Sequence, residues 1–211
     1  MIIAIDGPAG AGKSTVSRAL AVALQLDHLD TGAMYRAVTF GVLARGIDPA
    51  AREEVAEAAE DMTIDVGATS VVVDGVDATT AIRGRDVTDS VSAVAANPMV
   101  RDLLVRRQRE WVADRGGGVV EGRDITTVVL PDADLKLFVT ASPRVRAERR
   151  VAETGGDVDQ VEASIIERDR RDSTRSASPM TVASDAVVLD TSDLGIDEVV
   201  ERVLDMVGDG R

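Results

Sequence analysis

The chain has 211 residues and a net charge of −13, with 45% hydrophobic and 29% charged residues. This length favours a single domain, and the acidic balance disfavours a protein that binds nucleic acid through its overall charge. Cysteine is absent and His28 is the one histidine, which excludes disulfides, thiol nucleophiles and multi-histidine metal sites. No apolar run approaches the roughly 18 residues of a membrane span. The N-terminus lacks a basic leader, so we expect a cytoplasmic protein.

Strands and helices are predicted to alternate along the chain from hydrophobic periodicity and turn residues. The first half gives a strand at 2–5, a helix at 11–24, a strand at 26–29, and helices at 31–44, 49–62, 87–96 and 98–115. The second half gives strands at 119–120, 135–140 and 186–189, with helices at 143–151, 161–175 and 196–207. Short β-type runs around Asp74-Gly75 predict a small β-rich insert at 63–85. This alternation indicates an α/β fold, a parallel sheet with helices on both faces.

A phosphate-binding loop is predicted between the first strand and the first helix. The sequence fits G-x-x-x-x-G-K-[ST] fully, and the predicted nucleotide-binding residues are Gly7, Pro8, Ala9, Gly10, Ala11, Gly12, Lys13, Ser14 and Thr15. Glycines let backbone N–H groups converge on phosphate oxygens, and the helix N-terminus adds positive potential. Lys13 would place its charge on the β- and γ-phosphates, and the Ser14 hydroxyl would ligate Mg²⁺.

Nucleotide binding leaves the activity open. A GTPase switch usually carries a guanine-reading N/T-K-x-D segment, and neither Lys13 nor Lys136, the two lysines of the chain, lies in one. Motors and helicases are usually larger chains. A kinase for a small acceptor is therefore favoured, while another acceptor such as UMP, or a non-catalytic nucleotide switch, remains an alternative.

Arginines on the predicted helix 161–175 form a second candidate site. Arg168, Arg171 and Arg175 share one helix face with Asp172. This row is either a solvated face laced with ion pairs or a clamp for the transferring phosphoryl group. Arg146, Arg149 and Arg150 on the preceding helix carry the same ambiguity.

Polar residues also follow two predicted strands, at the sheet edge where α/β folds bind ligands. Thr31 to Arg36, including Tyr35, begins a helix there. After the strand at 119–120, Glu121 could hold Mg²⁺ through water and Arg123 could reach an anion. We interpret His28 as a structural residue and Ser142 as a helix cap.

Taken together, these segments resemble the bacterial cytidylate kinase family over essentially the whole chain. The resemblance includes Leu-Asp-Thr-Gly-Ala-Met-Tyr-Arg at 29–36 and Gly-Arg-Asp-Ile-Thr-Thr-Val-Val at 122–129. It extends over further segments in the family's order, at 6–8, 82–87, 92–101, 167–169, 171–175 and 186–190. Two departures stand out: Glu121 replaces a more usual aspartate, and Thr31 replaces a common serine.

The resemblance implies a nucleoside-monophosphate kinase fold with a five-stranded parallel core. The core would comprise 1–30, 102–146 and 161–211, the acceptor-binding region 31–101 with its insert at 63–85, and the lid 147–160. The implied reaction moves the γ-phosphate of ATP, with Mg²⁺, to CMP or dCMP in pyrimidine metabolism. We expect a monomer with small-molecule substrates and no nucleic-acid or membrane partner.

Site residues follow from the same resemblance. The implied contacts to CMP are Thr31, Tyr35, Arg36, Ser92, Arg101, Arg123, Asp124, Asp172 and Arg175. Ser92 and Arg101 would read the cytosine, Arg36 and Arg123 would hold the acceptor phosphate, and Asp172 and Arg175 would reach the ribose. Lys13, Arg123, Arg168 and Arg171 would be catalytic, and Ser14, with Glu121 through water, would hold Mg²⁺.

Overall fold

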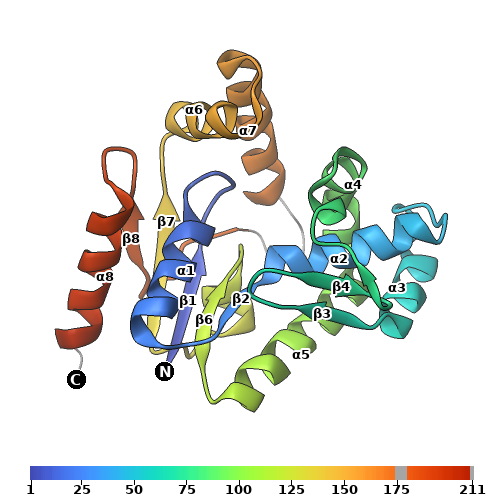
Figure 1. Ribbon diagram of the computed structural model, residues 1–211, viewed down its shortest axis with the longest axis horizontal. Coiled ribbons are helices and arrows are strands. Elements are labelled where there is room, and N and C mark those ends of the chain that lie inside the picture. The colour runs from blue at the N-terminus through green and yellow to red at the C-terminus, as the bar shows by residue number, and fades with distance from the viewer. Residues whose placement is uncertain (174–179, 210–211) are drawn as a thin grey trace. The chain divides into compact units, whose positions relative to one another are not determined.

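The computed structural model describes residues 1–173 and 180–209, without the side chains of Asp172, Ser173 and Asp209. The chain forms two compact units (Figure 1). The first comprises Met1–His28 and Arg115–Arg211, and the second comprises Leu29–Asp114. Each unit is described in turn.

A five-stranded sheet forms the centre of the fold, in the order β2-β6-β1-β7-β8. Its strands are β1 (Ile2–Asp6), β2 (His28–Asp30), β6 (Gly118–Glu121), β7 (Leu135–Thr140) and β8 (Val187–Asp190). The pairings of β1 with β6 and β7, and of β7 with β8, are parallel. The α/β class with a parallel core sheet is thus confirmed. Strand β1 is buried because it is the central strand, with two strands of the sheet on each side.

The helices of the first unit place polar segments beyond the carboxyl ends of these strands. They are α1 (Lys13–Leu24), α6 (Pro143–Thr154), α7 (Val158–Ser173) and α8 (Ile196–Asp209), together with the π-helical turn η2 (Ile125–Val129). Helix α1 packs against β6 and α8. Their apolar faces close a core with the strands, which includes Ile3, Ile5, Leu20, Val119, Leu137 and Val203.

The second unit contains α2 (Thr31–Ala44), α3 (Arg52–Asp61), α4 (Arg85–Ala95), the turn η1 (Ala81–Arg83) and most of α5 (Pro98–Arg115). Helix α2 packs against α3 and α4. The predicted β-rich insert is a three-stranded antiparallel sheet of β3 (Ile64–Val66), β4 (Val71–Val73) and β5 (Val76–Asp77). Asp74 and Gly75 form its hairpin turn, both with positive φ.

Several predicted bounds differ from the structure by a few residues. Helix α3 begins at Arg52 rather than at Pro49, because the Asp48 carboxylate accepts a hydrogen bond from the Ala50 N–H and closes a turn there. Helix α7 begins three residues earlier than predicted. The turn η2 was not predicted. None of the helices among the described residues has the length and apolar character needed to cross a membrane.

Candidate active site

The predicted phosphate loop connects β1 to α1, as its motif requires. Gly7 has a φ of 146°, and a Cβ there would lie 1.9 Å from the carbonyl oxygen of Val139. A side chain at this position would therefore collide with the backbone of β7. Gly12, with a φ of 88°, is the N-cap of α1, and no side chain makes a capping hydrogen bond at this positive end of the helix.

The carbonyl oxygens of the loop accept hydrogen bonds from side chains that surround it. Arg123 donates to Gly7, Lys13 to Pro8 at 2.8 Å, Arg146 to Ala9 at 3.2 Å and Thr191 to Ala11 at 3.1 Å. Within a peptide group the N–H points away from the carbonyl. The Gly7–Pro8 peptide has no N–H, but the other three bonds turn the N–H groups of Ala9, Gly10 and Gly12 to the opposite side, which is the arrangement that cradles an anion.

Lys13 and Ser14 face different partners at the start of α1. The Lys13 ammonium is bonded to the loop itself and is largely buried. The Ser14 hydroxyl donates to Glu121 Oε2 at 2.9 Å. The structure thus brings together Lys13, Ser14 and Glu121, three residues that the sequence assigned to phosphate and metal binding.

Glu121 ends β6 inside a buried polar cluster. Its Oε1 accepts from Ser17 Oγ at 3.1 Å and lies 3.1 Å from His28 Nε2. Burial by itself would raise the pKa of Glu121, but the hydrogen bond with His28 and the charge of Lys13 hold that pKa below its ordinary value. Glu121 is therefore ionised at neutral pH.

Asp6, at the end of β1, fixes the segment that follows β6. Its carboxylate accepts hydrogen bonds from the Ile125 N–H at 2.8 Å, the Thr126 N–H at 2.8 Å and the Thr126 hydroxyl at 2.6 Å. Burial raises the pKa of Asp6, and these hydrogen bonds partly oppose that rise. The bonds hold the start of η2, and so they fix the position of the neighbouring Arg123 and Asp124.

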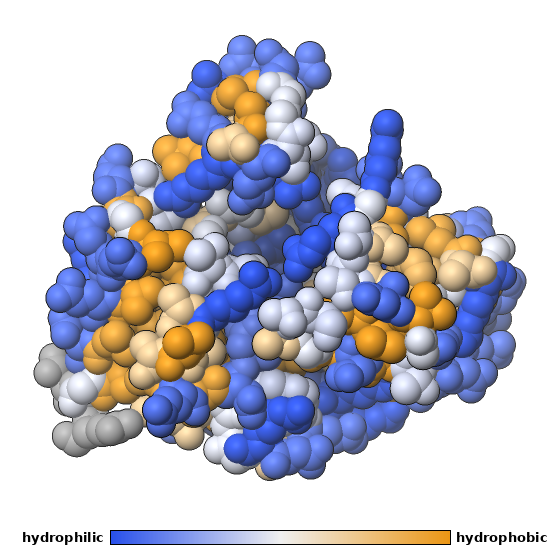
Figure 2. All heavy atoms as spheres, viewed as in Figure 1, coloured by the Kyte–Doolittle hydropathy of each residue, from blue (hydrophilic) through white to orange (hydrophobic). Residues whose placement is uncertain are grey.

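Helices α6 and α7 lie side by side (Figure 1), and with the turn that connects them they contain the predicted lid residues 147–160. Ser142 caps α6 by accepting from the Val145 N–H, as predicted. At the other end of the helix, Thr154 is followed by Gly155, whose φ of 73° lets the chain turn into α7. Hydrophilic side chains cover much of this hairpin in the space-filling view (Figure 2).

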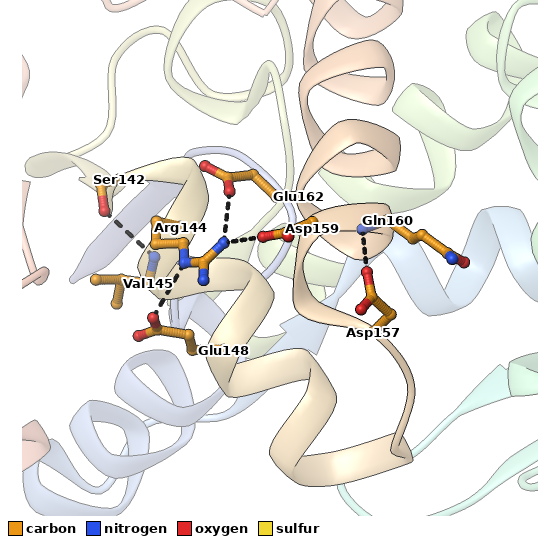
Figure 3. Close-up of polar contacts among 8 residues, drawn as sticks. All are labelled: Ser142, Arg144, Val145, Glu148, Asp157, Asp159, Gln160 and Glu162. Atoms are coloured by element: carbon orange, nitrogen blue, oxygen red, sulfur yellow. Dashed lines mark hydrogen bonds and ion pairs between the residues drawn. The ribbon is translucent and has the colours of Figure 1, made fainter.

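An exposed cluster of ion pairs joins the two helices. Arg144 on α6 contacts Asp159 and Glu162 on α7, and its Nε also bonds to Glu148 at 3.3 Å (Figure 3). Hydrogen bonds with Asp159 and then Glu162 raise the pKa of Arg144 above its ordinary value. The cluster fixes the hairpin through solvent-facing charges.

A buried contact also links this hairpin to the phosphate loop. Arg146 donates to the carbonyls of Ala141 and Ala9, and its Nη2 lies 2.7 Å from Asp169 Oδ2 on α7. The sequence left open whether six arginines of these helices form ion pairs or bind phosphate. For Arg146 the structure shows contacts that link the hairpin to the phosphate loop. Arg149 lies near it and bonds to Thr191.

The arginine row on α7 is divided in the structure. Arg171 is exposed and bonds to Glu167 at 3.1 Å, and Arg170 bonds to the same carboxylate at 2.9 Å. Arg168 is half-buried, next to Asp169. The backbone of Asp172 lies within α7, and Arg175 falls outside the described residues.

The predicted acceptor residues of the second unit lie on α2, α4 and α5. Asp30 caps α2 by accepting from the Ala33 N–H at 3.0 Å, so Thr31 begins that helix. Arg36 donates to the Ile82 carbonyl at 2.9 Å and to Thr88 Oγ1 at 3.0 Å. The remaining members are Tyr35 and Ser92, both half-buried, and Arg101, which is buried.

Comparison with known proteins decides the family. A family model described as cytidylate kinase matches residues 3–209. The chain is 52% identical to a cytidylate kinase of Corynebacterium efficiens, covering 98% of this chain and 94% of that one. It is 49% identical to one of Streptomyces griseus, covering 98% and 92%. The chain belongs to the cytidylate kinase family.

Solved structures agree with the fold at low sequence identity. A gluconokinase from Sinorhizobium meliloti aligns with a TM-score of 0.54 and 16% identity, covering 99% of this chain and 91% of that one. A shikimate kinase from Acinetobacter baumannii aligns with a TM-score of 0.51 and 14% identity, covering 100% and 94%. Membership in the cytidylate kinase family confirms the interpretation of the sequence as that of a phosphotransferase.

Two further residues contact Glu121 near the phosphate loop of this cytidylate kinase. Ser17 is not among the residues predicted from the sequence, and the interpretation of His28 as a structural residue did not anticipate its contact with Glu121. One signal was available for Ser17, since it lies three residues after Ser14 and so shares its helix face. The sequence carries no local signal for His28, which is 93 positions from Glu121.

Proposed function

We propose that the protein transfers the γ-phosphate of ATP to CMP or dCMP, giving ADP and CDP or dCDP. The observation that carries the proposal is the phosphate loop, whose carbonyl oxygens accept hydrogen bonds from side chains and which leads into Lys13 and Ser14 at the start of α1. The family supports the acceptor, because the match covers residues 3–209. We further propose that it acts as a monomer in the cytoplasm, where both nucleotides are present.

The donor half of the site would be the loop from Gly7 to Thr15. Its N–H groups would bind the β-phosphate, and Lys13 would exchange the Pro8 carbonyl for the β- and γ-phosphates. Lysine suits this place because its ammonium is a compact charge that can approach several phosphate oxygens.

The oxygen donors at the start of α1 fit Mg²⁺. The Ser14 hydroxyl and the Glu121 carboxylate are hard ligands 2.9 Å apart, and Mg²⁺ commonly takes few protein ligands together with phosphates and water. Within 1–173 and 180–209, no group of three or more acidic or histidine side chains could hold a metal by itself. Ser14 would therefore bind a metal that arrives with ATP, with Glu121 acting through water, and the ion would neutralise phosphate charge there.

The acceptor half would use the residues that the family resemblance implies. The proposed contacts are Thr31, Tyr35, Arg36, Ser92, Arg101, Arg123, Asp124, Asp172 and Arg175. Arg36 would have to exchange its contacts with Ile82 and Thr88 for the acceptor phosphate. Ser92 and Arg101 would read the cytosine edge, and Asp172 and Arg175 would bind the ribose.

Catalysis would rest on position and charge. The attacking oxygen belongs to an anionic phosphate, so no strong general base is needed. Lys13, Arg123, Arg168 and Arg171 would neutralise the charge that spreads over the phosphoryl oxygens. Closure of the lid residues 147–160 would exclude water and so prevent hydrolysis of ATP.

An ADP-release assay with ATP and Mg²⁺ tests this proposal, with CMP, dCMP, UMP, AMP, GMP or no acceptor in parallel reactions. Turnover with CMP and dCMP is the expected result. Turnover with a different acceptor would keep the donor half and remove the proposed base-reading residues. Release of ADP without any acceptor would contradict the transferase assignment.

A further inference from the structure

The Ser17–His28–Glu121 cluster behind the phosphate loop supports an inference that rests on the proposed function. We propose that His28 is a positioning residue for the metal site. Together with Ser17, it would hold one oxygen of Glu121. The other oxygen would then accept the hydrogen bond from the Ser14 hydroxyl, and the lone pairs of that hydroxyl would remain for Mg²⁺.

All three members of the cluster belong to the first unit and are shielded from water. Ser17 is 0% exposed, Glu121 is 3% exposed and the side chain of His28 is 8% exposed. A buried carboxylate is costly unless its oxygens are bonded. Here Oε1 has two neighbours, Ser17 Oγ and His28 Nε2, each at 3.1 Å, and Oε2 has the Ser14 hydroxyl at 2.9 Å.

The hydrogen-bond inventory fixes the proton on His28. A carboxylate only accepts hydrogen bonds. The Ser17 hydroxyl donates to Oε1 at 3.1 Å, and its oxygen also lies 3.0 Å from His28 Nε2. Nε2 therefore faces two acceptors, Oε1 and Ser17 Oγ, and this arrangement requires a proton on Nε2. His28 thus acts as a donor to Oε1.

A serine hydroxyl has one proton and two lone pairs. When the Ser14 hydroxyl donates its hydrogen bond to Glu121 Oε2, both of its lone pairs stay free for a cation. When Oε2 is not held in place, the three torsions of the glutamate side chain allow the carboxylate to turn away, and the Ser14 proton can point into the metal position. Outer partners of this kind commonly change metal affinity by about 10- to 100-fold.

The test compares His28→Leu with His28→Gln. Glutamine can present an amide N–H near the place of Nε2, whereas leucine fills the site without a donor. Calorimetry measures ATP affinity in EDTA and at increasing Mg²⁺, and the assay above gives the Mg²⁺ concentration for half-maximal rate. For His28→Leu, we expect that concentration to rise by about 10-fold, a matching loss in the Mg²⁺-dependent gain of ATP affinity, and unchanged affinity in EDTA. His28→Gln should restore most of the loss.

Two further variants separate the possible failures. In a Glu121→Gln background, His28→Leu should cause no additional loss, because both act on one oxygen pair. A His28→Leu variant that melts at a lower temperature but keeps the parent's Mg²⁺ dependence would overturn the inference and leave His28 structural. If Ser14→Ala also keeps that dependence, the proposed metal site itself is wrong.

Discussion

The phosphate loop and the α6–α7 hairpin both gather arginines, but they hold them in different ways. Around the loop, cationic side chains donate to backbone carbonyls, and most of these contacts are buried or half-buried. On the hairpin, Arg144 is held by carboxylates in contact with solvent. The difference indicates that the loop is held in one backbone geometry by buried donors, whereas the two helices of the hairpin are joined by ion pairs that face solvent.

Arg144 and Arg146 lie less than one turn apart on α6, and they differ in the same way. Arg144 is 50% exposed and pairs with Asp159 and Glu162, whereas Arg146 is 4% exposed and bonds to the loop and to Asp169. Exposed pairs contribute little to stability because water and salt screen them, while loss of one partner of a buried pair leaves a charge without compensation.

The largest expected effect is on the reaction rate, from the hairpin side of the comparison. Arg168→Ala should lower kcat by about 10³-fold or more if the guanidinium contacts the transferring phosphoryl group, with a smaller change in the KM for CMP. Arg170→Ala is the matched control on the same helix, since Arg170 bonds to Glu167 in solvent, and it should keep the parent kcat. A loss of thermal stability alone in Arg168→Ala would favour the ion-pair interpretation.

The next effect tests the loop side. Lys13→Ala should lower kcat by about 10²- to 10³-fold, because a charge donor aimed at the reacting group is lost. Lys136, the other lysine, pairs with Asp185, so Lys136→Ala should leave kcat unchanged. Steady-state kinetics with ATP and CMP decides this, and near-parent turnover in Lys13→Ala would remove the loop from the mechanism.

A third experiment compares the stability contributed by the buried and the exposed arginine of α6, measured as the free energy of unfolding in urea. Arg146→Met should lower that free energy by about 3 kcal/mol, because Asp169 and two carbonyls lose their donor. Arg144→Met should lower it by less than about 1 kcal/mol. Equal losses in the two variants would show that burial does not separate these arginines.

The smallest effect concerns pH. Hydrogen bonds from Arg170 and then Arg171 lower the pKa of Glu167 to about 2. Because the folded pKa is depressed, the pairing stabilises the folded state above the ordinary pKa of 4.5 and is lost as the pH falls towards 2. A carboxyl carbon NMR titration should give a midpoint near 2, rising towards 4.5 in Arg170→Ala/Arg171→Ala. A midpoint near 4.5 in the parent protein would contradict the pairing.

Local signals made much of the fold predictable. The phosphate loop is contiguous, so its motif and flanking elements could be read together, and the caps Asp30 and Ser142 act on residues three positions away. Helix α3 was placed too early because Asp48-Pro49 is both a helix start and a turn, and the sequence cannot separate the two.

Long-range contacts were not predictable in the same way. Ser17 and Glu121 are 104 positions apart, and Arg146 and Ala9 are 137 apart. Such pairs depend on strand order and on side-chain direction, which a single sequence does not reveal. The arginine row on α7 illustrates this limit, since spacing placed its members on one face but could not show that Arg171 would bond to Glu167.

The outward bonds of the loop carbonyls have a consequence for affinity. A glycine-rich segment normally loses much conformational entropy when a ligand orders it. Here the backbone of the loop is already held by Arg123, Arg146 and Thr191. The conformational entropy is therefore lost when the protein folds, and nucleotide binding does not have to pay this cost again. Under the proposed function, the Lys13 ammonium would still have to leave the Pro8 carbonyl to reach phosphate.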